Sequence, residues 1–208
     1  LLVRHGEVKA KEGVFGKSVY KVLQPEIIPF ISYPYEWSYS MLLQAAKLTL
    51  EIERLALSFD MTLKDASSYN IQFDGVKAVF IDILSFEKIK IGKPWVAYRQ
   101  FCQHFLAPLS LMKYKDFSLG RLGELFLDGI GLDLLVKLLP VKTYLNFQLF
   151  FHLYLHYLGQ KFFQNKKAWA QQININKSGL VNLIESLQDT LKSLEIKNSY
   201  SKWSNYYQ

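Results

Sequence analysis

The chain has 208 residues and a mass of 24.2 kDa; half of its residues are hydrophobic and 21% are charged. This composition excludes a largely disordered protein, and the length suits one domain with a sizeable core. The 25 Lys and Arg residues outnumber the 18 Asp and Glu residues, so the net charge of +7 favours anionic partners such as phosphates. The single cysteine, Cys102, excludes an internal disulfide framework and a cysteine-clustered metal site.

The first third of the chain predicts a short strand and a long helix. Residues 1–21 are polar, basic and poorly periodic, whereas residues 22–33 are apolar and carry two prolines, which suits an edge strand. Ser38 is placed to cap a helix, and apolar residues recur behind it at spacings of three and four up to Ser58. We therefore predict an amphipathic helix over 38–58.

A β-hairpin and a helical half follow. Asp74-Gly75 separates two apolar runs and favours a type I′ turn, which would place Phe73 opposite Val76 and Asn70 opposite Val79. Beyond the hairpin, Pro108 and Pro140 are expected to interrupt a mostly helical chain, with helices over residues 95–106, 119–126, 132–139, from 144, and 180–194. The sequence thus predicts an α+β, mainly helical fold.

Residues 144–163 are long and apolar enough to raise the question of a membrane span. They also contain Asn, Gln, His and Lys side chains, each of which would need a polar partner in hydrocarbon. We expect a buried or groove-lining aromatic helix here and no membrane span. Since Arg4, His5 and Glu7 interrupt any apolar run at the start, we expect no secretory signal and a soluble, cytoplasmic protein.

Three polar residues around the hairpin form the candidate site. Asp82 follows the second strand, and a loop from Asp65 to Asn70 precedes the first, so two carboxylates and an amide oxygen are expected to converge at one end of the hairpin. Such hard oxygen ligands suit Mg²⁺ together with substrate phosphates. Taken singly, Asp and Asn are common loop residues that bond nearby backbone, which is the structural alternative.

A helix, an Asp-x-x-x-x-Asn loop, a hairpin and a further Asp resemble, in this order, the large lobe of protein-kinase-like folds. The resemblance implies Asp65 as catalytic base, Asn70 and Asp82 as Mg²⁺ ligands, Lys64 and Asn70 as ATP contacts, and residues 27–35 as the hinge beside the adenine. The sequence departs from that pattern: Leu63-Lys64 replaces His-Arg, and Ile83-Leu84 replaces Phe-Gly.

The small lobe of such a fold is expected to be truncated. Residues 13–21 look like a kinase glycine loop, but too few residues separate them from the hinge-like segment, and Lys11 occupies the first glycine position of a P-loop. Other candidates are weaker: His152 and His156 have metal-ligand spacing without a following Glu, and Cys102 and His104 lie on different helix faces. Scattered basic residues do not indicate a specific nucleic-acid binder.

Four blocks of sequence resemble the N-terminal region of a bacterial family described as class I S-adenosylmethionine-dependent methyltransferases. They are residues 28–42, 63–73, 79–87 and 94–109, and the similarity extends loosely to residues 203–207. In that family the methyl-transfer domain follows C-terminally. The resemblance implies a transferase as the parent protein, with the S-adenosylmethionine site outside these residues and the methyltransferase domain of the same polypeptide as partner.

We therefore expect three parts: a small-lobe remnant at 1–21, a kinase-like helical domain at 22–195 with its hairpin at 70–82, and a linker at 196–208. The absent initiator Met leads us to expect a piece of a longer chain. The leading hypothesis is substrate recognition, or nucleotide and Mg²⁺ binding of a phosphate-bearing ligand, beside the methyl-transfer domain. The alternatives are an active ATP- and Mg²⁺-dependent phosphotransferase and a non-catalytic scaffold.

Overall fold

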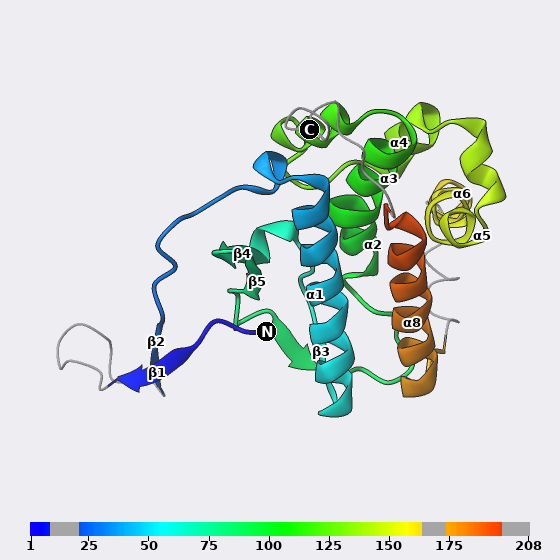
Figure 1. Ribbon diagram of the computed structural model, residues 1–208. Coiled ribbons are helices and arrows are strands. Elements are labelled where there is room, and N and C mark those ends of the chain that lie inside the picture. Colours follow the sequence, from blue (N-terminus) through cyan, green and yellow to red (C-terminus); the bar gives the residue numbers. More distant parts are fainter. Residues whose placement is uncertain (9–20, 164–173, 197–208) are drawn as a thin grey trace, which may run out of the picture.

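The computed structural model describes residues 1–8, 21–163 and 174–196. Helices dominate these residues, and the strands form small two-stranded sheets, so the fold is α+β and mainly helical as predicted (Figure 1). The strands are β1 (His5–Val8), β2 (Val22–Pro25), β3 (Met61–Leu63), β4 (Ile71–Asp74), β5 (Lys77–Phe80) and β6 (Phe86–Lys88).

The helices are of three kinds. The α-helices are α1 (Tyr39–Ser58), α2 (Tyr98–Phe101), α3 (Ala107–Tyr114), α4 (Leu132–Leu138), α5 (Phe147–Leu149), α6 (His156–Phe163) and α8 (Lys177–Leu194). The 3₁₀-helices are η1 (Pro34–Glu36), η2 (Ser68–Asn70), η4 (Phe117–Glu124) and η5 (Val141–Leu145), and the π-helices are η3 (Cys102–Leu106) and η6 (Phe150–Leu155).

Helix α1 confirms the predicted helix over 38–58. The Ser38 hydroxyl accepts a hydrogen bond from the Met41 N–H, and the buried face of the helix carries Ala45, Leu50 and Ile52. Helix α8 packs along α1 (Figure 1). The Tyr39 hydroxyl donates to the Leu194 carbonyl oxygen at 2.6 Å, which joins the start of one helix to the end of the other.

Replacing Ser38 with Ala is expected to lower the free energy of unfolding by about 1 kcal/mol, because the Met41 N–H loses its acceptor at the start of α1. Ser38→Asp keeps an acceptor oxygen and is the matched control. Urea unfolding of both variants measures the difference. Equal stability of Ser38→Ala and the unmodified chain would show that the cap contributes nothing.

The hairpin exists, but its predicted register is wrong by two residues. Phe73 pairs with Ala78 and Asp74 pairs with Lys77, so the turn residues are Gly75 and Val76. Gly75 has φ +58° while Val76 does not adopt positive φ, which excludes a type I′ turn and fits a turn of the II′ kind. The Ile81 N–H donates to the Asn70 carbonyl oxygen, so Asn70 faces Ile81.

Two strand pairings join segments that are distant in the sequence. Strand β3 pairs antiparallel with β6, which returns the chain after the hairpin to the start of the Asp65 loop. The first residues also pair with β5, since the Val3 N–H donates to the Phe80 carbonyl oxygen. Strand β1, unpredicted in residues 1–21, pairs with β2, and only Val22–Pro25 of the expected edge strand is a strand.

The helical half is less regular than predicted. Helices α2, η3 and α3 run without a break from Tyr98 to Tyr114, so Pro108 does not interrupt them. The π-type bond from the Ala107 N–H to the Cys102 carbonyl oxygen shifts the pattern just ahead of the proline, which has no N–H to donate. The helix predicted over 119–126 is a 3₁₀-helix over residues 117–124, and α4 and α8 are confirmed.

The segment from residue 144 begins in the last turn of η5, and after Asn146 the helices α5, η6 and α6 are consecutive from Phe147. Its inner side is buried, with Leu149, Leu153 and Tyr154 in the core. No helix among the described residues is long and apolar enough to cross a membrane. Residues 13–20, which belong to the segment that resembles a kinase glycine loop, lie outside the described residues. The tail from residue 197 lies outside them as well.

Candidate functional site

The loop that carries Asp65 begins at a residue held by two buried side chains. The Glu53 carboxylate accepts from the Leu63 N–H at 2.6 Å, and the Trp95 indole donates to the Leu63 carbonyl oxygen at 2.8 Å. Glu53 also accepts from the Thr62 hydroxyl at 2.7 Å. These bonds fix the end of β3 against α1, two residues before Asp65.

Glu53 is fully buried inside the protein, on the core side of α1. Burial raises the pKa of its carboxyl from 4.5 to about 7, and the hydrogen bonds from Leu63 and Thr62 only partly oppose this. The side chain that holds the start of the Asp65 loop therefore has a pKa close to neutral pH.

The middle of the loop is held from α2 and η3. The Ala66 N–H donates to the Gln100 side-chain oxygen at 2.7 Å. Ser68 Oγ lies 3.2 Å from Nδ1 of His104, whose pKa is lowered because the ring is buried. The loop thus has a fixed path from Leu63 to Asn70.

The structure brings Asp65, Asn70 and Asp82 into one hydrogen-bonded chain. The Asn70 amide donates to Asp65 Oδ1 at 3.1 Å and to Ser85 Oγ at 3.3 Å. The Ser85 hydroxyl in turn donates to Asp82 Oδ2 at 2.5 Å. The three residues predicted to converge at this end of the hairpin lie together, with Ser85 as the link, but the Asn70 nitrogen and not its oxygen faces this chain of side chains.

Some oxygens of this cluster remain available to a cation. Because the Asn70 nitrogen faces acceptors on Asp65 and Ser85, its Oδ1 points elsewhere and makes no hydrogen bond with any described residue; neither does Asp65 Oδ2. Each oxygen of Asp82 already accepts one bond, from the Leu84 N–H and from Ser85. Lys64 is exposed, and its backbone N–H donates to the Ser85 carbonyl oxygen.

Within the described ranges there is no group of three or more His, Cys, Asp and Glu side chains that could hold a metal ion. The cluster around Asn70 contains two carboxylates, so an amide oxygen would have to supply the third protein ligand. Mg²⁺ sites commonly use one or two carboxylates and take their other ligands from water and phosphate.

The hinge-like segment, residues 27–35, is attached to the hairpin by one side chain. The Gln72 amide accepts from the Ser32 N–H at 3.1 Å and donates to the Ser32 carbonyl oxygen at 3.0 Å. The Trp37 indole donates to the Ser32 hydroxyl at 2.8 Å. Ile27 and Phe30 are nevertheless largely exposed, at 84% and 74%, so this segment presents apolar side chains beside β4.

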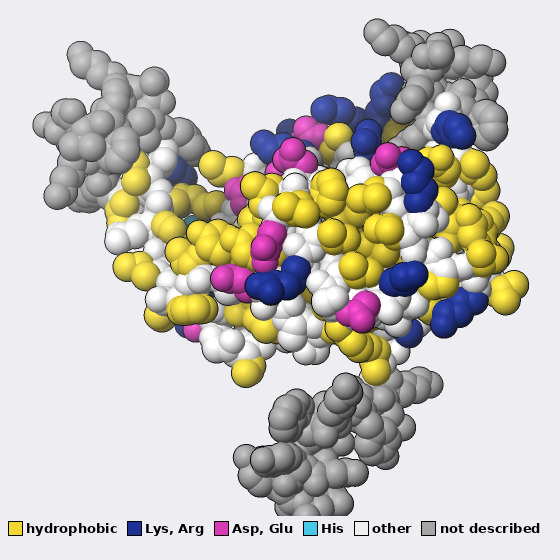
Figure 2. Space-filling model, turned by 90° about the horizontal axis from the view of Figure 1, so that it is seen from above, with side chains coloured by type: hydrophobic (Ala, Val, Ile, Leu, Met, Phe, Trp, Pro, Cys, Tyr) yellow, Lys and Arg dark blue, Asp and Glu magenta, His cyan; other side chains and the backbone are white. Residues whose placement is uncertain are grey.

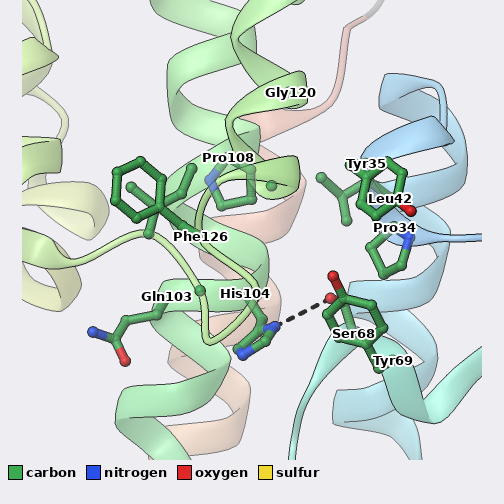
Figure 3. Close-up of a pocket in the computed structure, with 13 residues that line it drawn as sticks. Pro34, Tyr35, Leu42, Ser68, Tyr69, Gln103, His104, Pro108, Gly120 and Phe126 are labelled. Carbon is green, nitrogen blue, oxygen red and sulfur yellow. Dashed lines mark hydrogen bonds between the residues drawn. The ribbon is translucent and has the colours of Figure 1, made fainter.

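A small cavity lies behind the Asp65 loop, between η1, η3 and η4 (Figure 3). Ser68 and His104 lie on one side of it, joined by their hydrogen bond, with Tyr35 and Phe126 among the other lining residues. Its volume is about 30 Å³, which is room for one or two water molecules and far too small for a nucleotide.

The remaining sequence candidates have structural partners. His152 Nδ1 lies 2.8 Å from the Tyr98 hydroxyl and its Nε2 lies 2.9 Å from Ser186 Oγ, while His156 stacks on the Tyr98 ring. The Cys102 thiol faces the His152 carbonyl oxygen, and burial raises its pKa to about 12. Cys102 and His104 therefore do not form a nucleophile–base pair.

Sequence reasoning missed Ser85, Glu53 and Gln72, which organise the cluster and its surroundings. Glu53 had a detectable signal. It directly follows Ile52 of the apolar pattern, and the helix faces on both sides of Glu53 are buried. Ser85 had none, because its place beside Asn70 depends on the pairing of β3 with β6.

Comparison with known proteins gives one partial similarity. Nodulation protein NoeA of Rhizobium meliloti (strain 1021) is 36% identical to the chain over 142 residues. The aligned region is 68% of this chain and 30% of the relative, so the chain spans less than a third of that protein's length. No protein-family model matches the chain, and no solved structure matches it.

Proposed function

We propose that this chain is a kinase-like domain that binds a nucleotide with Mg²⁺ through Asp65, Asn70 and Asp82. The observation that carries the proposal is the hydrogen-bonded chain Asp65–Asn70–Ser85–Asp82, which leaves Asn70 Oδ1 and Asp65 Oδ2 available. In type and chain order, Asp65 matches the catalytic base of protein kinases, and Asn70 and Asp82 match their two metal ligands.

The support of the loop favours the same function. Glu53, Trp95 and Gln100 hold its backbone through buried or partly buried hydrogen bonds, so Asp65 and Asn70 are positioned before any ligand arrives. Prepositioned ligands reduce the entropic cost of binding a cation and its phosphates. Gln72 likewise holds the hinge-like segment beside the hairpin, where an adenine would be expected.

The resemblance to methyltransferases extends the proposal to the parent protein. In this reading S-adenosylmethionine binds to a methyl-transfer domain of the same polypeptide and the present chain binds the phosphate-bearing ligand. The partial similarity to a longer relative is compatible with such a division. Asp65, whose Oδ2 is available, is the residue that would act as base if the domain also transferred phosphate.

Calorimetric titration with ATP tests the proposal. The chain is expected to bind ATP when Mg²⁺ is present and to lose at least about tenfold in affinity in Asp82→Ala, because one metal ligand is removed. Asp74→Ala, an exposed aspartate in the same hairpin, is the matched control and should bind as the unmodified chain does. Absence of Mg²⁺-dependent binding by the unmodified chain would contradict the proposal.

The scaffold alternative is favoured by the two bonds that Asp82 accepts from its own turn. A scaffold predicts that Asp65→Ala and Asp82→Ala each cost about 1–3 kcal/mol of stability through stranded donors, without any binding of ATP by the unmodified chain. Thermal unfolding of Asp65→Ala and Asp82→Ala, compared with the ATP titration of the unmodified chain, distinguishes a scaffold from a ligand site.

A further inference from the structure

The segment from Val141 to Leu158 leaves large apolar side chains on the surface. Four of them, which we call the apolar stripe, follow one side of the run from α5 to α6 at spacings of four, four and three. They are Phe147, Phe151, Leu155 and Leu158, with exposed fractions of 78%, 47%, 43% and 39%. Val141 and Leu145, just before the stripe, are exposed at 81% and 89%, while the opposite side of the helical run is buried.

The same part of the chain carries nearly all of its net charge. Residues 134–184 contain six lysines, no arginine and no acidic residue, which amounts to +6 of the total of +7. Lys137, Lys142 and Lys161 are exposed, and none of the three forms an ion pair with another described residue. In Figure 2, hydrophobic side chains and Lys or Arg side chains share the right-hand side, where this segment lies in Figure 1.

The charge identifies the kind of surface that the stripe fits. An acidic partner is favoured, since its negative groups would meet Lys142 and Lys161, which are distant in the sequence from any carboxylate, and Lys137, which forms no ion pair with Asp133 on the same helix. Protein interfaces favour Arg and are depleted in Lys, whereas here the basic residues are all lysines. Lysines beside a helical row of Phe and Leu are typical of helices that lie in the headgroup region of a membrane.

We propose that the apolar stripe and its lysines attach the protein peripherally to a membrane surface of anionic phospholipids. Phe147 and Phe151 would enter the boundary between headgroups and acyl chains, and Lys137, Lys142 and Lys161 would face the lipid phosphates. Each such lysine contributes about 1 kcal/mol near an anionic surface. The helical run lies along the surface in this arrangement, and the core behind Leu149 and Leu153 stays intact.

Sedimentation with lipid vesicles tests this attachment. The 208-residue chain is expected to bind vesicles that contain phosphatidylglycerol and not vesicles of phosphatidylcholine alone, with binding that weakens as salt is added. The triple variant Lys137→Glu, Lys142→Glu, Lys161→Glu should lose at least about tenfold in apparent affinity. The double variant Phe147→Ser, Phe151→Ser should show a comparable loss.

Matched controls come from other faces. Lys77→Glu, Lys88→Glu, Lys115→Glu makes the same charge change outside residues 134–184, and Ile27→Ser, Val76→Ser removes two apolar side chains exposed at 84% and 91%. Both controls should bind anionic vesicles as the unmodified chain does. Equal binding to neutral vesicles, or no binding to either kind, would overturn the proposal. So would self-association in sedimentation velocity that the Phe variants abolish, since the stripe would then contact a second copy.

Discussion

Glu53→Gln is expected to make the protein more stable than the unmodified chain by about 3 kcal/mol at pH 8 and by less than about 1 kcal/mol at pH 5. The buried carboxyl has a pKa of about 7 in the folded state against 4.5 when unfolded, so the folded state holds its proton more tightly. The corresponding stability is complete below pH 4.5 and is lost as the pH rises through 7. Gln has the same shape and no charge to bury.

The measurement is urea unfolding at several pH values between 5 and 8, on Glu53→Gln and on Glu51→Gln. Glu51 lies on the exposed side of the same helix, so its variant reproduces the change in net charge without a change in burial. The difference in stability between Glu53→Gln and the unmodified chain should grow with pH. If the stability of Glu53→Gln and of the unmodified chain changed with pH in parallel, ionisation of Glu53 would cost no folding stability.

Local patterns were sufficient for the parts of the fold that depend on neighbouring residues. The helix over 38–58 followed from its apolar spacing and from the acceptor on Ser38, both of which act within a few residues. The hairpin was located by its glycine. Its register was missed because Gly75 alone adopts positive φ, so that a II′ turn over Gly75 and Val76 replaces the expected turn at Asp74 and Gly75.

Features that depend on distant contacts could not be predicted. Ser85 joins Asn70 to Asp82 because β6 returns to pair with β3, and no local pattern in residues 82–88 specifies that partner. The pairing of Val3 with Phe80 is of the same kind. The path through Pro108 also escaped prediction, since the π-turn that accommodates a proline depends on the packing of the whole helix.

The residues of the candidate site were predicted from residue type and order, whereas their geometry is determined by residues on other elements. Asp65, Asn70 and Asp82 lie together, although the Asn70 nitrogen and not its oxygen faces Asp65 and Ser85. The loop from Leu63 to Asn70 is fixed by Glu53, Gln100 and His104 on other elements. Residues that bind a ligand often follow a short sequence pattern, whereas the residues that position them come from segments that only the fold brings close. The second group is where sequence reasoning has least information.

His152→Phe is expected to lower the free energy of unfolding by about 2–4 kcal/mol at pH 7, because the partly buried Tyr98 and Ser186 hydroxyls lose the partner that they share. The triple variant Tyr98→Phe, His152→Phe, Ser186→Ala removes both hydroxyls and should recover much of the loss. Unfolding in urea at pH 7 compares the two variants with the unmodified chain. If the triple variant were no more stable than His152→Phe, the loss of stability in His152→Phe would come from packing and not from hydroxyls without a partner.

The same histidine makes the protein sensitive to acid. Burial, with a smaller contribution from His156, lowers the pKa of His152 from 6.5 to about 4, so the unfolded state binds protons more readily. The free energy of unfolding therefore contains the full contribution of His152 above pH 6.5. It falls by about 3 kcal/mol as the pH is lowered to 4. This is opposite in sign to the effect of Glu53. Relative to the unmodified chain, His152→Phe should lose less stability between pH 6.5 and 4, whereas His5→Gln, at an exposed position, should follow the unmodified chain throughout.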